Sequence, residues 1–276
     1  MGILDGIVSL FSGGCSAGDY ESVVAYVKKK YNVDLKTSAM PQGTPVAYGQ
    51  ILEWRGKPQA DVFWGGEGTL FDNLAAQGLL DPIQLPKAMW DEIPATIGKP
   101  IGLPLKDDKK FWVGTTLEPY GLIYQPKLLQ RLGVTIKDWD DLLNPKLKGQ
   151  IAQCTPDRSS SSHASYEVIL AMHGWEKGWE WLTKLAANTG IFTARSRDVP
   201  SVVSKGEFAV GFAVPSYMAF AEVLGGYDVK FVYPKNAYVT PAPMAVLKGA
   251  PPHKAGHTYS EVPLTEEGQR ICVDGP

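Results

Sequence analysis

Short apolar runs that end at glycine, serine or proline turns recur along this sequence. Val62–Trp64 stops at a glycine pair, and apolar residues then return at helical spacing. Ile151–Cys154 is a second such run, interrupted only by Gln153, and residues 208–214 form a third. Because the strands of a parallel sheet are buried on both faces and are connected by helices, this pattern predicts an α/β fold with doubly wound sheets.

The same pattern divides the chain into elements and into two domains. Strands are predicted at 7–11, 33–38, 61–64, 111–116, 121–124, 151–154, 208–214 and 230–233, and helices at 20–31, 46–55, 159–170 and 175–185. Residues 82–110 are rich in proline, glycine and lysine, which is typical of a surface connection. Glu118-Pro119-Tyr120 separates two predicted strands, so we expect the chain to cross between domains there and to return near 233–239. The first domain is then 1–120 plus 238–276, and the second is 121–237.

Loops that follow predicted strands are candidate ligand contacts. The carboxyl ends of parallel strands open onto a crevice, where turns expose backbone N–H groups. In the first domain these loops contain Gly13, Gly14, Thr44, Gly65, Gly66 and Glu67. We expect them to hold one end of a small ligand, with Glu67 suited to an amine.

Four consecutive serines begin the helix that follows residues 151–154. Asp157 and Arg158 precede Ser159, Ser160, Ser161 and Ser162. Hydroxyl groups, free first-turn N–H groups and a guanidinium together suit a phosphate, phosphonate or carboxylate. Ordinary capping by Asp157 or Ser159 is the simpler interpretation. Four serines exceed what a cap requires, so the sequence favours an anion site.

Two arginines precede the next short helix, for which Asp198 is the expected N-cap. Arg195 and Arg197 either reach the anion or neutralise surface carboxylates, and both interpretations stay open. Tyr217 and Tyr238 follow the last two strand patterns and are expected to line the sides of the site.

Composition excludes several classes of function. The 27 Lys and Arg are scattered among 29 Asp and Glu, so neither a nucleic-acid footprint nor a polybasic membrane patch is present. No apolar run has the ~20 residues that a membrane helix needs. The amino terminus has neither the basic start nor the apolar core of a signal peptide, so we expect a cytosolic chain or a removed leader. Cys15 is expected to be a loop cysteine rather than a lipoprotein cleavage site.

Two other chemistries can be drawn from the residues. A hydrolase would use Cys154 or one of Ser159–Ser162 with His163, but there is no G-x-S-x-G motif and His163 lies on the same helix start. A hard cation such as Fe(III) would take oxygen ligands from Tyr217, Tyr238, Glu67 and Asp157. The three cysteines have no metal-binding spacing. We therefore expect no enzyme activity, no cofactor and no metal.

Several motifs follow one another in the order of a known family. They are Ala60-Asp-Val-Phe-Trp-Gly-Gly, Gln77-Gly-Leu-Leu-Asp-Pro, Asp140-Asp-Leu-Leu-Asn-Pro, Lys205-Gly-Glu-Phe-Ala-Val-Gly, Val239-Thr-Pro-Ala-Pro-Met-Ala-Val and Leu264-Thr-Glu-Glu-Gly-Gln. Through these motifs the chain resembles the extracellular solute-binding proteins of ABC importers. The most similar branch holds ferric-iron, phosphonate and sugar-phosphate binders.

This resemblance implies a two-lobed, type II periplasmic-binding-protein-like fold with mixed sheets and a ligand cleft between the lobes. It implies a monomer that binds a small anionic ligand, an ABC permease as partner, and a periplasmic or extracellular location. Ser196 falls where the branch often has an anion-contacting asparagine. The iron-binding branch has a tyrosine pair where this chain has Ser216-Tyr217, and its glutamate aligns with Gly66, next to Glu67. An iron site would use Tyr217 and Glu67, and the missing tyrosine argues against it.

Overall fold

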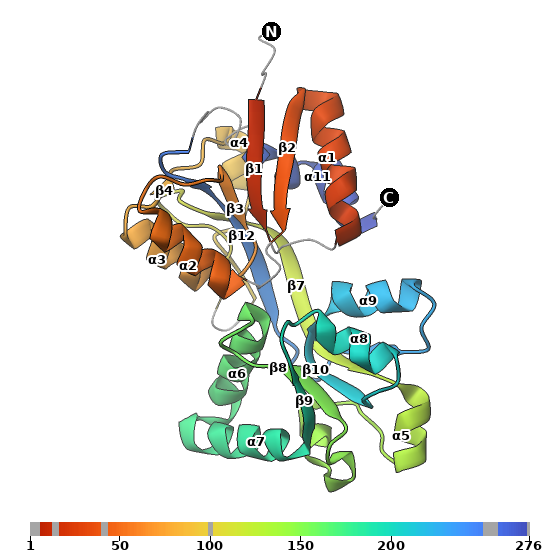
Figure 1. Cartoon of the computed structure of the whole chain (residues 1–276). Coiled ribbons are helices and arrows are strands. Elements are labelled where there is room, and N and C mark those ends of the chain that lie inside the picture. The colour runs from red at the N-terminus through yellow and green to blue at the C-terminus, as the bar shows by residue number, and fades with distance from the viewer. Residues whose placement is uncertain (1–5, 13–16, 40–43, 99–101, 251–258, 275–276) are drawn as a thin grey trace. The chain divides into compact units, whose positions relative to one another are not determined.

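The computed structural model describes residues 6–12, 17–39, 44–98, 102–250 and 259–274 of the chain (Figure 1). The chain forms two compact units. Unit 1 comprises Met1–Leu117 and Thr240–Pro276, and unit 2 is the intervening segment Glu118–Val239. Two strands, β7 (Val113–Tyr124) and β12 (Val239–Leu247), contain the residues where the chain passes from one unit to the other.

Unit 1 is built on a mixed sheet with the strand order β2-β1-β3-β12. Strand β1 is parallel to β2 and β3, whereas β12 is antiparallel to β3 and β4. Its elements are β1 (Gly6–Ser12), α1 (Ala17–Tyr31), β2 (Val33–Ala39), α2 (Thr44–Trp54), β3 (Val62–Trp64), α3 (Gly68–Ala76), β4 (Leu80–Asp81), α4 (Lys87–Glu92), β5 (Thr96–Ile97), β6 (Leu103–Pro104), the 3-10 helix η3 (Val262–Leu264) and α11 (Glu266–Asp274).

The apolar run of β3 packs on both faces of this sheet. Phe63 stacks on Phe71 of α3 at a centroid distance of 4.7 Å, and Trp64 meets the ring of Tyr259 edge-on at 6.3 Å. Successive strand residues point to opposite faces, and all three β3 residues are buried. The uninterrupted apolar run in the sequence follows from this two-sided burial.

Unit 2 has a second mixed sheet with the strand order β7-β10-β8-β9. Strand β8 is parallel to β10 and β9, and β7 is antiparallel to β10 and β11. Besides part of β7, unit 2 contains α5 (Pro126–Leu132), the 3-10 helices η1 (Trp139–Leu143) and η2 (Pro145–Leu147), β8 (Ile151–Cys154), α6 (Ser160–His173), α7 (Trp175–Asn188), β9 (Thr189–Thr193), α8 (Asp198–Ser204), β10 (Val210–Pro215), α9 (Ser216–Leu224) and β11 (Lys230–Val232). The α/β pattern predicted from the sequence is confirmed in both units.

Two local predictions are wrong. The strand β7 is continuous through Glu118–Tyr120, although Pro119 suggested a break. Proline cannot donate a backbone hydrogen bond, but its φ is compatible with extended structure. The segment 82–110 is not only a surface connection, because it contains α4, whose Trp90 is 8% exposed. Lys106 and Lys110 lie over the Trp90 ring, so residues that indicated a solvated loop cover an aromatic side chain.

Candidate functional site

Two of the four predicted serines cap the helix α6. Ser159 is the N-cap, and its hydroxyl accepts a hydrogen bond of 3.2 Å from the backbone N–H of Ser162. Both side chains are 4% exposed. The capping interpretation therefore accounts for Ser159 and Ser162, and it excludes Asp157 as the cap.

The other two serines occupy the first turn of α6 and are only partly buried. The N–H groups of Ser160 and Ser161 have no hydrogen-bond acceptor among the described residues. These groups are at the positive end of a 14-residue helix. Asp157 and Arg158 precede the turn and are exposed. The turn therefore offers two N–H groups, two hydroxyl groups and a nearby guanidinium to an anion.

A stacked pair of tyrosines contacts this turn. The rings of Tyr120 and Tyr238 are nearly parallel, with centroids 4.6 Å apart and an interplanar angle of 7°. The Tyr238 hydroxyl donates to the Ser161 carbonyl at 3.4 Å and also bonds to the Ser165 hydroxyl. The Tyr120 hydroxyl lies 3.3 Å from Ser161 Oγ. Ser161 is thus held by both tyrosines.

Sequence reasoning missed Tyr120 and Glu118 as neighbours of the serine turn. The Tyr120 hydroxyl donates to Glu118 Oε2 at 3.1 Å, so a carboxylate lies next to the serine turn. The available signal was the placement of Glu118-Pro119-Tyr120 directly before an apolar strand pattern. That signal was interpreted only as a connection between domains.

Arg195 and Ser196 lie between β9 and α8. Arg195 forms a two-bond ion pair with Asp198, at 3.2 Å from Nε and 2.9 Å from Nη2. This pairing agrees with the simpler interpretation of Arg195 as the partner of a surface carboxylate. Asp198 is not the N-cap of α8, because that position belongs to Arg197, and Asp198 is the first helical residue.

The strand β10, which precedes Tyr217, is irregular near its end. In β10, Ala213 has a φ of +57°, and the register with β7 shifts between Gly211 and Val214. Such a bulge re-aims the residues that follow. Tyr217 is the second residue of α9, just beyond this strand.

In unit 1 the structure brings Thr44 and the glycine turn together. Gly65 and Gly66 have φ values of +96° and +99°, which favour glycine. A Cβ atom on Gly66 would collide with Cγ2 of Thr44, the first residue of α2. Glu67 is the N-cap of α3, and its side chain makes no capping bond. Gly13 and Gly14 lie outside the described residues.

This close approach gives a testable prediction for the turn. We expect Gly66→Ala to lower the free energy of unfolding by about 2–4 kcal/mol, because it adds a methyl clash to the cost of a positive φ. The matched control is Gly56→Ala, since Gly56 has a φ of +78° and open space around it. It should cost only about 1–2 kcal/mol in a urea titration. Thr44→Ser removes the colliding methyl and should recover the difference, and equal losses in both alanine variants would contradict the prediction.

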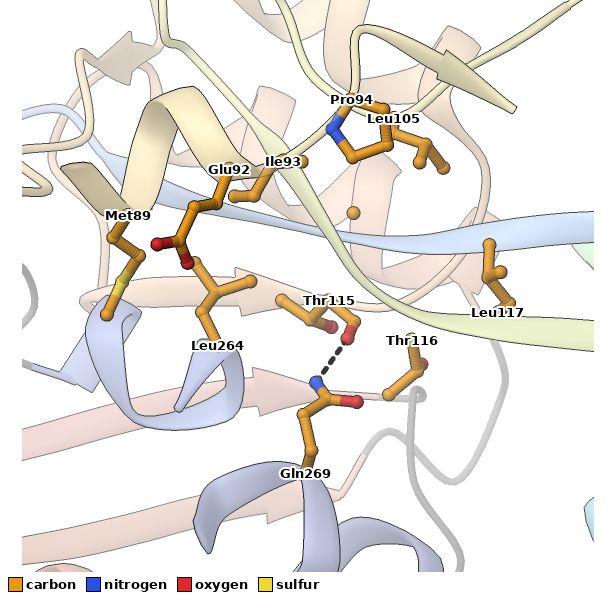
Figure 2. Close-up of a pocket in the computed structure, with 11 residues that line it drawn as sticks. Met89, Glu92, Ile93, Pro94, Leu105, Thr115, Thr116, Leu117, Leu264 and Gln269 are labelled. Atoms are coloured by element: carbon orange, nitrogen blue, oxygen red, sulfur yellow. Dashed lines mark hydrogen bonds between the residues drawn. The ribbon is translucent and has the colours of Figure 1, made fainter. Parts of the chain in front are cut away.

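A separate pocket of about 430 Å³ lies within unit 1 and contains none of the predicted site residues (Figure 2). Its walls are mostly apolar, and Gln269 of α11 closes one side by donating to the Thr115 carbonyl at 2.6 Å. Ile93 directly follows α4, and Leu264 is the last residue of η3; both line the pocket. This pocket has no charged group except Glu92, so it does not suit an anion.

The surroundings of Cys154 and His163 concern the hydrolase alternative. Cys154 is buried, and desolvation raises the pKa of its thiol, which disfavours the thiolate that a nucleophile needs. His163 Nε2 lies 3.9 Å from Oε1 of Glu167, on the same helix α6. Among the residues that the structure describes, no three His, Cys, Asp or Glu side chains form a metal-binding group. None of the described helices is long and apolar enough to cross a membrane.

Comparisons with known proteins match most of the chain. The family described as bacterial extracellular solute-binding protein matches residues 57–274. The phosphoglycerate transport regulatory protein PgtC of Salmonella typhimurium is 26% identical over 188 residues, which are 68% of this chain and 46% of PgtC. The chain therefore spans about half the length of this relative. A second Salmonella typhimurium protein, provisionally named as a 2-aminoethylphosphonate-binding periplasmic protein, is 23% identical over 236 residues, or 82% of this chain and 64% of that protein.

Solved structures show the same fold. The periplasmic binding protein AfuA from Actinobacillus pleuropneumoniae, solved with fructose-6-phosphate, has a TM-score of 0.86 at 22% identity and covers 98% of this chain and 82% of AfuA. Iron-bound HitA from Pseudomonas aeruginosa has a TM-score of 0.80 at 21% identity, covering 97% of this chain and 84% of HitA. These similarities confirm the predicted type II periplasmic-binding-protein fold.

Proposed function

Since the chain belongs to the family of bacterial extracellular solute-binding proteins, we propose that it captures a small organic anion for an ABC importer. The observation that carries this proposal is the first turn of α6. There the N–H groups of Ser160 and Ser161 have no acceptor among the described residues, and the Ser161 hydroxyl accepts from the Tyr120 hydroxyl at 3.3 Å. A phosphonate, phosphate ester or carboxylate supplies the oxygen atoms that these donors require.

The names of the relatives support a phosphorus-containing anion. Three similar proteins are described by the compounds phosphoglycerate, 2-aminoethylphosphonate and fructose-6-phosphate. Each of these compounds carries a tetrahedral oxyanion on a small organic group. A helix start with two hydroxyls suits such a group, because several donors converge on one charged centre.

The proposed partners and location follow from the family. The protein would bind its ligand outside the cytoplasmic membrane and deliver it to a membrane permease, with no bond made or broken. Arg158, Arg195, Ser196, Tyr217 and the loop residues of unit 1 are proposed further contacts. A ferric site on Tyr217 and Glu67 remains the alternative prediction.

Thermal unfolding with a ligand panel tests this proposal. The panel contains fructose 6-phosphate, 2-aminoethylphosphonate, 3-phosphoglycerate, inorganic phosphate and ferric citrate. A ligand at a hundred times its Kd should stabilise the protein by ~2.7 kcal/mol and raise Tm by several degrees. A selective rise with one organophosphorus compound supports the proposal. A rise with ferric citrate alone, lost in Tyr217→Phe, would replace it by the iron alternative.

A further inference from the structure

The pocket within unit 1 has a chemistry different from that of the serine turn, and none of its lining residues belongs to that turn. Its volume of about 430 Å³ is within the range of small-molecule sites. We call it the α4 pocket, because α4 and the residues after it form one of its walls (Figure 2). An apolar body is the first requirement for a ligand here. The side chains that make the pocket mostly apolar are Met89, Ile93, Pro94, Leu105, Leu117 and Leu264.

Glu92 brings a negative charge to this apolar pocket. It is three positions after Met89 in α4, so both side chains lie on the same face of the helix, and both line the pocket. The Glu92 side chain is exposed and forms no ion pair or hydrogen bond with any residue that the structure describes. Its neighbour Asp91, by contrast, pairs with Lys87. Since no lysine or arginine is among the residues that line the pocket, the Glu92 charge is available to a ligand.

Gln269 adds a second acceptor whose orientation is fixed. Its Nε2 donates to the Thr115 carbonyl at 2.6 Å and also to the Pro263 carbonyl. Only the amide nitrogen can donate to two carbonyls, so these bonds determine which side of the amide holds Oε1. None of the described residues donates to Oε1, and Figure 2 shows this atom on the side of the amide toward Thr116. A group on a ligand can therefore donate to it.

The two threonines of the α4 pocket offer no donor to a ligand. The Thr115 hydroxyl accepts from the Trp64 indole N–H and donates to the Ala242 carbonyl. The Thr116 hydroxyl oxygen is buried. The accessible polar side-chain atoms of the pocket are then acceptors, and one of them is a carboxylate. Such a set complements a cation with N–H donors and repels an anion.

We propose that the α4 pocket binds small organic ammonium compounds. The apolar body of the ligand packs against Ile93 and Leu264, and its ammonium group pairs with Glu92. Gln269 Oε1 accepts from a second N–H or hydroxyl group where the ligand has one. The inference does not depend on the anion site at α6, because the two sites have no residue in common. It gives the protein a second site with the opposite charge preference.

Methyl NMR with labelled methionines tests this proposal and localises the binding. Phenethylamine and 2-phenylethanol differ only in the ammonium or hydroxyl group at the end of the same apolar body. Phenethylamine should shift the Met89 signal to saturation and bind about two- to fivefold more tightly than 2-phenylethanol, as expected for an ion pair with an exposed carboxylate. Met172 of unit 2 is partly exposed and serves as the reference signal that should not move. Met89→Leu assigns the Met89 signal.

Two matched carboxylate variants complete the experiment. Glu92→Gln should abolish the preference for phenethylamine, because it removes the charge and keeps the shape of the side chain. Asp91→Asn changes the adjacent carboxylate, which does not line the pocket, and should keep the preference. Thermal unfolding without ligand checks that both variants fold. An unmoved Met89 signal, equal affinity for the two compounds, or the same loss of preference in both variants overturns the proposal. The anion panel tests the proposed function separately, since its compounds should leave the Met89 signal in place.

Discussion

Replacing Ser160 and Ser161 together by alanine is expected to weaken binding of the organic anion by about 100-fold or more. Each hydroxyl would donate one hydrogen bond to a charged oxygen, and such a bond contributes ~1.5–3 kcal/mol. Two of them correspond to roughly two to four powers of ten in Kd. The backbone N–H groups remain in the variant, so some affinity should persist. Calorimetric titration with the compound that gives the largest thermal shift measures the change.

Stability and position controls make this result interpretable. Both serines are partly exposed, and neither caps the helix, so Tm without ligand should change little. Ser201→Ala in α8 removes a comparable hydroxyl elsewhere in unit 2 and should leave Kd unchanged. By contrast, Ser159→Ala removes the N-cap and should cost about 1 kcal/mol of stability. A double variant that keeps wild-type affinity would rule out the serine turn as the anion site.

Trp64→Ala is expected to cost at least about 3–5 kcal/mol of unfolding free energy, a large fraction of a typical domain's stability. The Trp64 side chain is fully buried, and its indole N–H donates to Thr115 Oγ1 at 2.7 Å. The Thr115 hydroxyl in turn donates to the Ala242 carbonyl at 3.0 Å. These two hydrogen bonds connect β3, β7 and β12 within unit 1. Truncation leaves both a cavity and an unpaired hydroxyl acceptor. Urea denaturation measures the loss.

A second tryptophan provides the matched control. Trp175 at the start of α7 is 66% exposed and packs edge-on against Trp179. Trp175→Ala should therefore cost less than about 1 kcal/mol. Thr115→Val separates the hydrogen bond from the cavity, because it leaves the Trp64 N–H without a partner, and it should cost ~1–3 kcal/mol. Comparable losses at Trp64 and Trp175 would show that Trp64 does not anchor the core of unit 1.

The buried strands were predictable from the sequence because their signal is local. Val62–Trp64 is apolar at every position and Ile151–Cys154 at every position except Gln153, and both become strands covered on two faces. The continuity of β7 was not predictable in the same way. Proline at position 119 lowers the strand signal there, whereas the pairing of Tyr120 with Tyr238 depends on a segment more than a hundred residues away. Tertiary pairing overrides such a local preference.

In the candidate site, too, contacts between residues close in sequence were predictable and contacts between distant residues were not. The cap at Ser159 and the ion pair between Arg195 and Asp198 join residues three apart, so spacing alone suggests them. The contact between Tyr120 and Ser161 joins residues 41 apart. No periodicity in one sequence contains that information. The side chains that hold the serine turn in place therefore became visible only in the folded structure.

The insertion of unit 2 within unit 1 has a consequence for folding during synthesis. Residues 118–239 are contiguous, and their ends meet where the Tyr120 N–H donates to the Tyr238 carbonyl at 3.1 Å. The sheet of unit 1, by contrast, needs β12 beside β3, and β12 ends at residue 247. During synthesis, residues 1–117 therefore cannot complete the sheet of unit 1 until β12 has been made, which happens after the whole of unit 2. We expect unit 2 to be the first part to acquire its native contacts, while the apolar strands of unit 1 are exposed for longest and depend most on chaperones.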